Sequence, residues 1–258
     1  MRAVSLHPDV LVVTSAVLHV NCVIVRSDGE TFVIDSPVLP EELDALPALV
    51  EQAGFPAPSG LLATHGDWDH VLGPLAFPDV ALGCAQSTAE RLVASPGEPQ
   101  RGLRAFDEDL YIQRPRPLAL GSLQGLPVPG RCELGDGELE LHQADGHTLD
   151  GMAVLIGWAG VLVPGDYLSA IELPALGAGD TIDAYATTLS RLRPLLDRAQ
   201  HVVPGHGPVV SPERARELLE QDVVYLEELR RRGAQAQLPD GRSSRQQRKQ
   251  HAANVAVL

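Results

Sequence analysis

A short polar stretch directly after an apolar run constrains this chain more than any other feature of its sequence. Leu61–Ala63 reads as a buried strand, and four metal-binding side chains follow it closely: His65, Asp67, Asp69 and His70. Imidazole nitrogen and carboxylate oxygen are the usual ligands of Zn²⁺, and they also suit Fe and Mn. A solvated polar turn is the alternative. Because ligand types occupy alternate positions and a fourth follows at once, the stretch favours a metal site at a strand end.

Three later stretches repeat this arrangement of a β run, a glycine-containing turn and a ligand-type side chain. They place three further candidate ligands in the chain: His147, Asp166 and His206. Glycine permits the tight turn that brings such a side chain close to a shared centre. A single Gly-His or Gly-Asp pair usually marks only a turn. Four such stretches in one chain indicate strand ends that converge on one site.

Apolar β-branched runs alternate with amphipathic stretches, and this order predicts an α/β layered domain. The pattern predicts strands over 10–25, 31–34, 60–64, 80–84, 138–142, 152–156, 160–164 and 201–203. It predicts helices over 41–53, 87–94, 181–198 and 212–232. Thr181 and Ser211 are the expected N-caps of the last two helices, and Pro212 suits a first helical position.

Two segments lack sustained periodicity. The segment 95–130 is dense in Pro and Gly, and we expect an irregular insertion near the mouth of the site, with short edge strands at 118–120 and 126–128. It carries Arg101, Arg104, Arg114 and Arg116. Residues 233–258 are polar and are expected to form a flexible basic tail, although the last apolar residues could dock. Residues 1–232 are predicted to form a single domain.

Composition narrows the classes of partner and compartment. The formal net charge of −14 makes nucleic acid an unexpected partner. The cysteines (Cys22, Cys84 and Cys132) form no CxxC pair, which fits a reducing cytoplasm and argues against a thiolate zinc site. We expect no signal peptide and no membrane-spanning segment. The preference for arginine over lysine, with abundant Ala, Gly and Pro, suggests a bacterial coding sequence.

Together these motifs resemble the metallo-β-lactamase-fold hydrolase superfamily, over about residues 20–208. The resemblance implies a four-layer αβ/βα sandwich with a metal site at one edge of two packed sheets. It further implies two ligand groups: His65, Asp67 and His147 for metal one, and Asp69, His70 and His206 for metal two. Asp166 would bridge the two metals. Asp69 and Asp166 are the implied catalytic residues, Asp69 because it can both bind metal and orient the nucleophile.

Asp67 departs from the family's pattern, in which the second residue of the first motif is usually His. A carboxylate can replace imidazole as a ligand, so two divalent ions are expected, with Zn²⁺ as the first choice and Mn or Fe as alternatives. The harder oxygen donor should weaken the Lewis acidity of metal one. A single bound metal, or none, are the other outcomes.

The resemblance implies hydrolysis, in which a metal-activated hydroxide attacks an acyl carbonyl or a phosphorus. Because the body of the chain is acidic, a small ester, thioester or lactone is the expected substrate. A phosphodiester, clamped by the arginines of 95–130 or of the tail, comes second. A sulfur dioxygenase with one iron and a metal-binding protein without catalysis stay open. A small molecule is the expected partner, and a dimer stays open.

Overall fold

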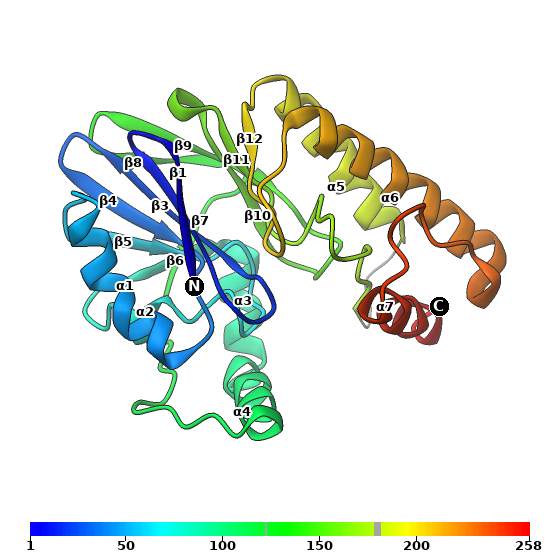
Figure 1. The fold of residues 1–258 in the computed structure, drawn as a ribbon, viewed down its shortest axis with the longest axis horizontal. Helices are drawn as coiled ribbons and strands as arrows, with labels where there is room; N and C mark the ends of the chain where they lie inside the picture. The colour runs from blue at the N-terminus through cyan, green and yellow to red at the C-terminus, as the bar shows by residue number, and fades with distance from the viewer. Residues whose placement is uncertain (122, 178–181) are drawn as a thin grey trace.

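Two β-sheets pack face to face between two layers of helices (Figure 1). The structure is a computed structural model, and it describes residues 1–121, 123–177 and 182–258. The layers are those of an αβ/βα sandwich, so the fold class expected from the sequence is confirmed.

The first sheet has seven strands that follow one another in sequence order. They are β1 Arg2–His7, β2 Val10–Thr14, β3 Asn21–Ser27, β4 Glu30–Ile34, β5 Gly60–Leu62, β6 Leu82–Ala85 and β7 Leu123–Leu126. Strands β1 to β4 pair antiparallel, whereas β4 to β7 run parallel. Because parallel strands end at the same edge, the loops that follow β4 and β5 emerge side by side.

The second sheet has five strands in the order β12, β11, β10, β9, β8. They are β8 Gly130–Leu134, β9 Gly137–Gln143, β10 Met152–Ile156, β11 Val161–Val163 and β12 His201–Val202. Strands β8 to β11 are antiparallel neighbours, and β12 runs parallel to β11. The carboxyl ends of β9, β11 and β12 therefore share one edge, as the ends of β4 and β5 do in the first sheet.

Helices cover the outer face of each sheet (Figure 1). The first sheet is covered by α1 Pro40–Gln52, α2 Gly73–Ala76 and α3 Gln86–Ala94, and the second by α5 Ile182–Leu192 and α6 Pro212–Arg232. Short 3₁₀ turns lie at η1 Gly157–Ala159 and η2 Arg193–Asp197. The side chain of Ser211 accepts a hydrogen bond from the backbone N–H of Arg214, which confirms the predicted cap of α6. Thr181, the other predicted cap, lies outside the described residues.

The core is apolar and β-branched where the two sheets meet. Val12, Val23 and Ile34 of the first sheet share a buried cluster with Leu141 and Val154 of the second, and each is at most 1% exposed. Burying one such side chain contributes roughly 1.5–3 kcal/mol. Two further clusters fill the space between each sheet and its helices. The packed strands therefore form a rigid support for the loops at their ends.

The segment 95–130 is not the irregular insertion that the sequence predicted. Glu98–Leu110 forms helix α4, and β7 follows it. Residues 118–120, which the structure describes, do not form the predicted edge strand. The strand predicted at 126–128 overlaps β7 only at Leu126.

Helix α4 depends on a contact that no local pattern shows. Trp68 lies in the loop 63–70 after β5, called the ligand loop because it carries four of the predicted ligands, and it packs on Phe106 with ring centroids 4.7 Å apart. It also lies against Gly102, where a Cβ would stand 2.7 Å from the Trp68 ring. With Gly102 inside it, α4 has a weakened intrinsic propensity, and tertiary packing contributes to its stability.

The prediction of a flexible tail over 233–258 is also wrong. After the 3₁₀ turn η3 Gly233–Gln235, residues Arg245–Ala256 form helix α7, with Ser244 as its cap. Asn254 donates a hydrogen bond to the carbonyl oxygen of Pro174, so α7 is attached to the loop after β11. In Figure 1, α7 lies below α6, folded back from the far end of that helix towards the body of the molecule.

Smaller differences concern boundaries. Strand β1 was not predicted, and the run 10–25 forms two strands whose connection places Leu18 and His19 at positive φ. The predicted helix 181–198 ends at Leu192 and continues as η2. Within the described part of the chain, no helix combines the length and apolar composition that a membrane span requires.

Candidate metal centre

The predicted ligand residues lie on loops at one edge of the two sheets, directly after strands. Four of them follow β5: His65, Asp67, Asp69 and His70. The other three come from the second sheet: His147 between β9 and β10, Asp166 after β11, and His206 after β12. The structure brings all of these side chains into one connected cluster. Residues far apart in the sequence thus share one site because their strands end at a common edge.

Asp166 lies at the centre of the cluster. Its Oδ2 lies 3.3 Å from Nε2 of His147 and 3.3 Å from Nε2 of His206. Its Oδ1 lies 3.3 Å from Nε2 of His70, and its Oδ2 lies 3.7 Å from Nε2 of His65. A carboxylate that contacts imidazoles from both sheets occupies the position that a bridging ligand needs.

The remaining side chains form two groups, His65 with Asp67 and His147, and Asp69 with His70 and His206. Within each group, the candidate ligand atoms lie within 4.8 Å of one another. In the first group, Oδ2 of Asp67 is 3.8 Å from Nε2 of His65 and 3.6 Å from Nε2 of His147. In the second, Oδ2 of Asp69 is 3.4 Å from Nε2 of His206. These are the two groups that the sequence resemblance implied.

Three buried atoms of the cluster have no hydrogen-bond partner in the described structure: Nε2 of His65, Nε2 of His147 and Oδ1 of Asp166. A buried polar atom left without a partner costs about 1–3 kcal/mol, so native structures rarely keep one. Here several such atoms, all of ligand type, face one another. A divalent cation would satisfy them at once, and the donor set therefore fits metal ions.

In His70 and His206, the ring nitrogen Nδ1 faces away from the cluster and has a hydrogen-bond partner outside it. Nδ1 of His70 lies 2.9 Å from Oδ2 of Asp35, and Nδ1 of His206 lies 2.9 Å from the carbonyl oxygen of Leu18. Such a partner places the proton on Nδ1 and leaves the lone pair of Nε2 free to bind a cation. The surrounding structure thus orients the imidazoles towards the centre.

Opposing charges shift the pKa values of the clustered groups. Burial lowers the pKa of His147 and His206, but their carboxylate neighbours outweigh it. The nearby carboxylates of Asp67 and Asp166 raise the pKa of His147 to about 9, and Asp166 raises that of His206 to about 10. Burial raises the pKa of Asp166, yet the nearby histidines hold it well below its usual range. Asp166 is therefore charged at neutral pH, as a metal ligand must be.

Four polar residues beside the cluster were missed from the sequence: Asp35, Arg91, Asp150 and Glu172. Glu172 forms a further candidate ligand group with Asp166 and His206. Asp35 follows β4 directly, so the rule that strand ends carry the site could have found it. Arg91 lies on α3, and Asp150 and Glu172 lie further along the loops that carry His147 and Asp166, so none of them stands next to the glycine that marks the predicted ligands.

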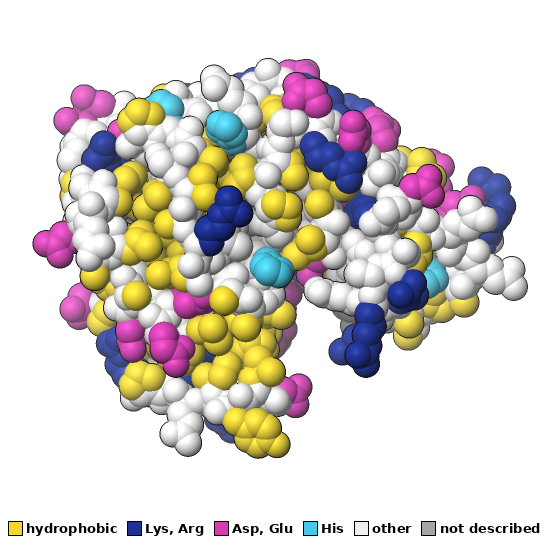
Figure 2. All heavy atoms as spheres, in the orientation of Figure 1, with side chains coloured by type: hydrophobic (Ala, Val, Ile, Leu, Met, Phe, Trp, Pro, Cys, Tyr) yellow, Lys and Arg dark blue, Asp and Glu magenta, His cyan; other side chains and the backbone are white. Residues whose placement is uncertain are grey.

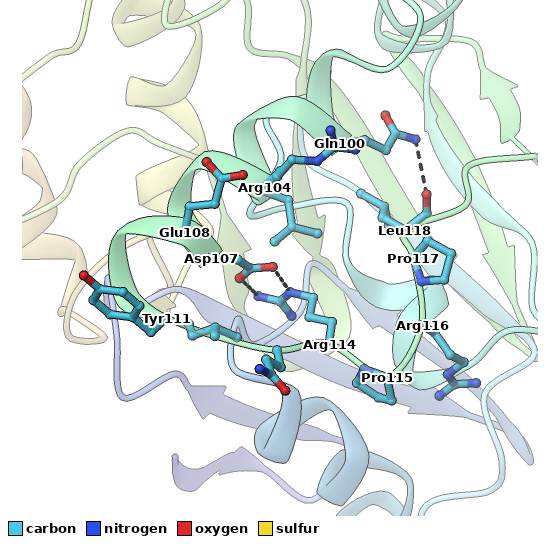
Figure 3. A pocket seen from close by; sticks show the side chains of 13 residues that line it. Gln100, Arg104, Asp107, Glu108, Tyr111, Arg114, Pro115, Arg116, Pro117 and Leu118 are labelled. Carbon is cyan, nitrogen blue, oxygen red and sulfur yellow. Dashed lines mark hydrogen bonds and ion pairs between the residues drawn. The ribbon is translucent and has the colours of Figure 1, made fainter.

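A cavity of about 810 Å³ between α4 and the segment 111–118 is separate from this cluster. Figure 3 shows Arg114 directed at Asp107, and its Nε donates a hydrogen bond of 2.7 Å to Oδ2 of that residue. Arg116 donates to the carbonyl oxygen of Leu75 at 2.7 Å. None of the predicted ligands lines this cavity. These arginines thus have partners of their own.

The face seen in Figure 2 is hollowed between the part of the molecule that carries α4 and the part that carries α7. Hydrophobic side chains gather on the α4 side of the hollow, and Lys and Arg side chains lie on the α7 side. The segments 95–130 and 233–258, for which the sequence predicted little regular structure, therefore border the same hollow.

Comparison with solved structures shows the same fold. A metallo-beta-lactamase from Pontibacter korlensis aligns with a TM-score of 0.66 and 18% identity, over 88% of this chain and 98% of that one. A metallo-beta-lactamase family protein from Thermus thermophilus aligns with a TM-score of 0.64 and 21% identity, over 87% and 83% of the respective chains. A sequence search of curated proteins finds no match.

The sequence profile described as the metallo-beta-lactamase superfamily matches residues 16–206. This range contains every predicted ligand, from His65 to His206, and all strands of both sheets apart from β1 and β2. The chain therefore belongs to the metallo-beta-lactamase superfamily.

Proposed function

We propose that this protein is a metal-dependent hydrolase that uses two divalent metal ions, with Zn²⁺ as the expected metal and Mn or Fe as alternatives. One observation carries the proposal. Imidazole and carboxylate side chains from four separate strand ends face one another in a buried cluster, and some of their atoms have no partner in the described structure. Superfamily membership supports chemistry of the hydrolase type.

The two ligand groups divide the proposed metals between them. The first metal would be held by His65, Asp67 and His147, the second by Asp69, His70 and His206, with Asp166 shared. Divalent ions, when bound there, would supply Lewis acidity, which lowers the pKa of water to about 7 and polarises a carbonyl or phosphoryl oxygen.

Two carboxylates are the proposed catalytic residues. Asp69 lies 3.4 Å from His206 through its Oδ2 and would both hold the second metal and orient the attacking water. Asp166 contacts imidazoles of both groups and holds them in one geometry. The buried histidines exclude bulk water from the inner side of the site, which strengthens every electrostatic interaction there.

A small ester, thioester or lactone is the proposed substrate class. The competing phosphodiester requires cationic side chains that clamp phosphate. Three arginines of the segment 95–130 have other partners: Arg101 donates to the carbonyl oxygen of Pro96, Arg114 to Asp107, and Arg116 to Leu75. For these three side chains, the observation favours a neutral acyl substrate over a phosphodiester. The same site with one iron would instead suit an oxygenase.

Elemental analysis of the purified protein, with a panel of chromogenic ester, thioester, lactone and phosphodiester substrates, tests the proposal. We expect two divalent ions per chain and turnover of an acyl substrate that stops on chelation. Oxygen uptake with a single bound iron would replace the hydrolase with an oxygenase. A protein that binds no metal and turns over none of these substrates would contradict the proposal altogether.

A further inference from the structure

The first ligand group contains a carboxylate whose two oxygens face different partners. Oδ2 of Asp67 is directed at the cluster, 3.6 Å from Nε2 of His147 and 3.8 Å from Nε2 of His65. Oδ1 of Asp67 instead accepts a hydrogen bond of 2.9 Å from Nη2 of Arg91 on α3. Only one oxygen of this carboxylate is thus presented to the proposed metal.

Arg91 is itself held by two further carboxylates. Its Nη1 donates to Oδ1 of Asp150 at 2.8 Å, and its Nη2 donates to Oε1 of Glu98 at 2.7 Å. Asp150 is 1% exposed, and its Oδ2 accepts hydrogen bonds from the backbone N–H of Gly66 at 2.9 Å and from Oγ1 of Thr88 at 2.7 Å. The guanidinium is therefore anchored to a buried carboxylate that is also tied to the ligand loop.

An aspartate alone does not define which of its oxygens faces a cation. Rotation about the terminal torsion of Asp is broad and nearly two-fold, so the carboxylate can turn or present both oxygens. Arginine offers donors in a rigid planar fork, and one anchored by other carboxylates gives a fixed direction to the oxygen that it binds. Arg91 thus restricts Asp67 to the single-donor role that an imidazole nitrogen fills without help.

We propose that Arg91 is a positioning residue for the first metal site, which holds Oδ1 of Asp67 so that Oδ2 alone joins His65 and His147. This inference rests on the proposed function, because it needs a metal at that site. Arg91 touches neither metal nor substrate in this role. Arg91 enables the Asp67 carboxylate to act as a ligand with a single oxygen at this position of the ligand loop.

Removal of Arg91 has two opposing consequences for a cation at the first site. The loss of a positive charge favours cation binding, whereas the loss of the fixed donor disfavours it. Loss of a partner that orients a ligand typically costs about 10–100-fold in metal affinity, and the charge of a residue that is already paired with three carboxylates is largely compensated. Weaker binding is therefore the expected net result.

A double-mutant cycle on zinc affinity tests this role. The two stepwise zinc affinities of the full-length protein are measured by competition with a chromogenic chelator, and elemental analysis gives the stoichiometry. His147→Ala identifies the affinity that belongs to the first site. Arg91→Met is then compared in the wild-type and Asp67→His backgrounds. Glu98→Gln is the matched control, because it removes the charge of a partner of Arg91 without touching Asp67.

We expect Arg91→Met to weaken the first site about tenfold or more in the wild-type background and less than about threefold in the Asp67→His background, where no carboxylate needs positioning. Glu98→Gln should change the affinity less than about threefold. Arg91→Lys keeps the positive charge but loses the planar guanidinium donors, and it should resemble Arg91→Met. Because lysine is the milder substitution, an equal loss in both variants argues against misfolding as the cause.

Two results would overturn the inference while the proposed function stands. One is two-ion binding that Arg91→Met leaves unchanged or strengthens. The other is an equal loss in both backgrounds, which would make Arg91 a support of the fold alone. A wild-type protein that binds none of zinc, Mn and Fe would overturn the proposed function and this inference together, and this outcome is recognised before any variant is measured.

Discussion

Nδ1 of His70 lies 2.9 Å from Oδ2 of Asp35, which follows β4 with a φ of 56°. The carboxylate of Asp35 also accepts hydrogen bonds from the backbone N–H and Oγ1 of Thr64, at 2.8 and 2.9 Å. A left-handed backbone at a residue other than glycine is uncommon, and Asp tolerates it better than most. Asp35 thus joins the ends of two neighbouring strands and sets the direction of one imidazole in the cluster.

Asp35→Asn should weaken zinc binding at the second site about 10–100-fold, the usual cost of losing a carboxylate partner behind a ligand histidine. The amide carries no charge to hold the Nδ1 proton of His70, so the ring is free to turn. Zinc affinity measured by chelator competition checks this, with the exposed Asp79→Asn as a control. Unchanged affinity at both sites would show that the orientation of His70 does not depend on Asp35.

Asp166→Ala should abolish two-metal binding, because Asp166 is the one carboxylate that contacts imidazoles of both ligand groups among the described residues. Elemental analysis after dialysis should then give at most one ion per chain. Thermal unfolding of the metal-free variant shows whether the fold survives the change. A stoichiometry equal to that of the wild-type protein would remove Asp166 as a bridge.

The site could be predicted from the sequence because its residues have a local signature. Each of His147, Asp166 and His206 follows a β run and a glycine, and parallel or neighbouring strands end at a common edge. Gly205 shows how close this approach is, since a Cβ there would stand 2.0 Å from Oδ1 of Asp166. The position of a residue after a strand and a glycine is therefore enough to predict that it belongs to the site, without knowledge of any contact.

The parts that the sequence did not reveal depend on contacts between distant residues. Helix α4 needs Trp68 against Gly102, and Arg91 acquires its role only when α3 packs beside the ligand loop. Helix α7 has little amphipathic character, and its attachment comes from polar contacts such as that of Asn254 with Pro174. Periodicity records which face of an element is apolar, and it carries no information about such polar tertiary contacts.

Asp67→His should raise the affinity of the first site for Zn²⁺, because imidazole is the softer donor and suits this ion better than a carboxylate oxygen. We expect an increase of about tenfold or more, with the second site changed far less. Chelator competition against zinc and against Mn²⁺ measures the preference, which should move towards zinc. If neither affinity responds, Asp67 is not a ligand.

The raised pKa values of His147 and His206 predict how the stability of the metal-free protein depends on pH. In the folded protein these values are about 9 and about 10, so both histidines hold protons more tightly than in the unfolded chain, where their pKa is about 6.5. Their contribution to the free energy of unfolding is thus complete below about pH 6.5 and is lost as pH rises through about 9 to 10. Urea unfolding from pH 6 to 10 measures this loss, which should vanish once zinc is bound, because ligand histidines are neutral. Stability that stays constant over this range without metal would contradict these charge states.

Arg242→Met should destabilise the protein although it lies in a segment whose sequence suggests disorder. Arg242 is 2% exposed, its Nη1 lies 2.6 Å from Oδ1 of Asp222 on α6, and its Nη2 donates to the carbonyl oxygen of Ser169. Removing one partner of a buried ion pair typically costs about 3–5 kcal/mol, because the other charge stays buried and unpaired.

Urea unfolding of the Arg242→Met variant measures this cost, and Arg248→Met, on the exposed side of α7, is the matched control, expected within about 0.5 kcal/mol of the wild-type protein. Because Ser169 lies on the loop that follows Asp166, the Arg242→Met variant should also bind the second zinc ion more weakly. Equal unfolding free energies for the two variants would mean that the buried ion pair of Arg242 with Asp222 contributes nothing to the stability of the folded state.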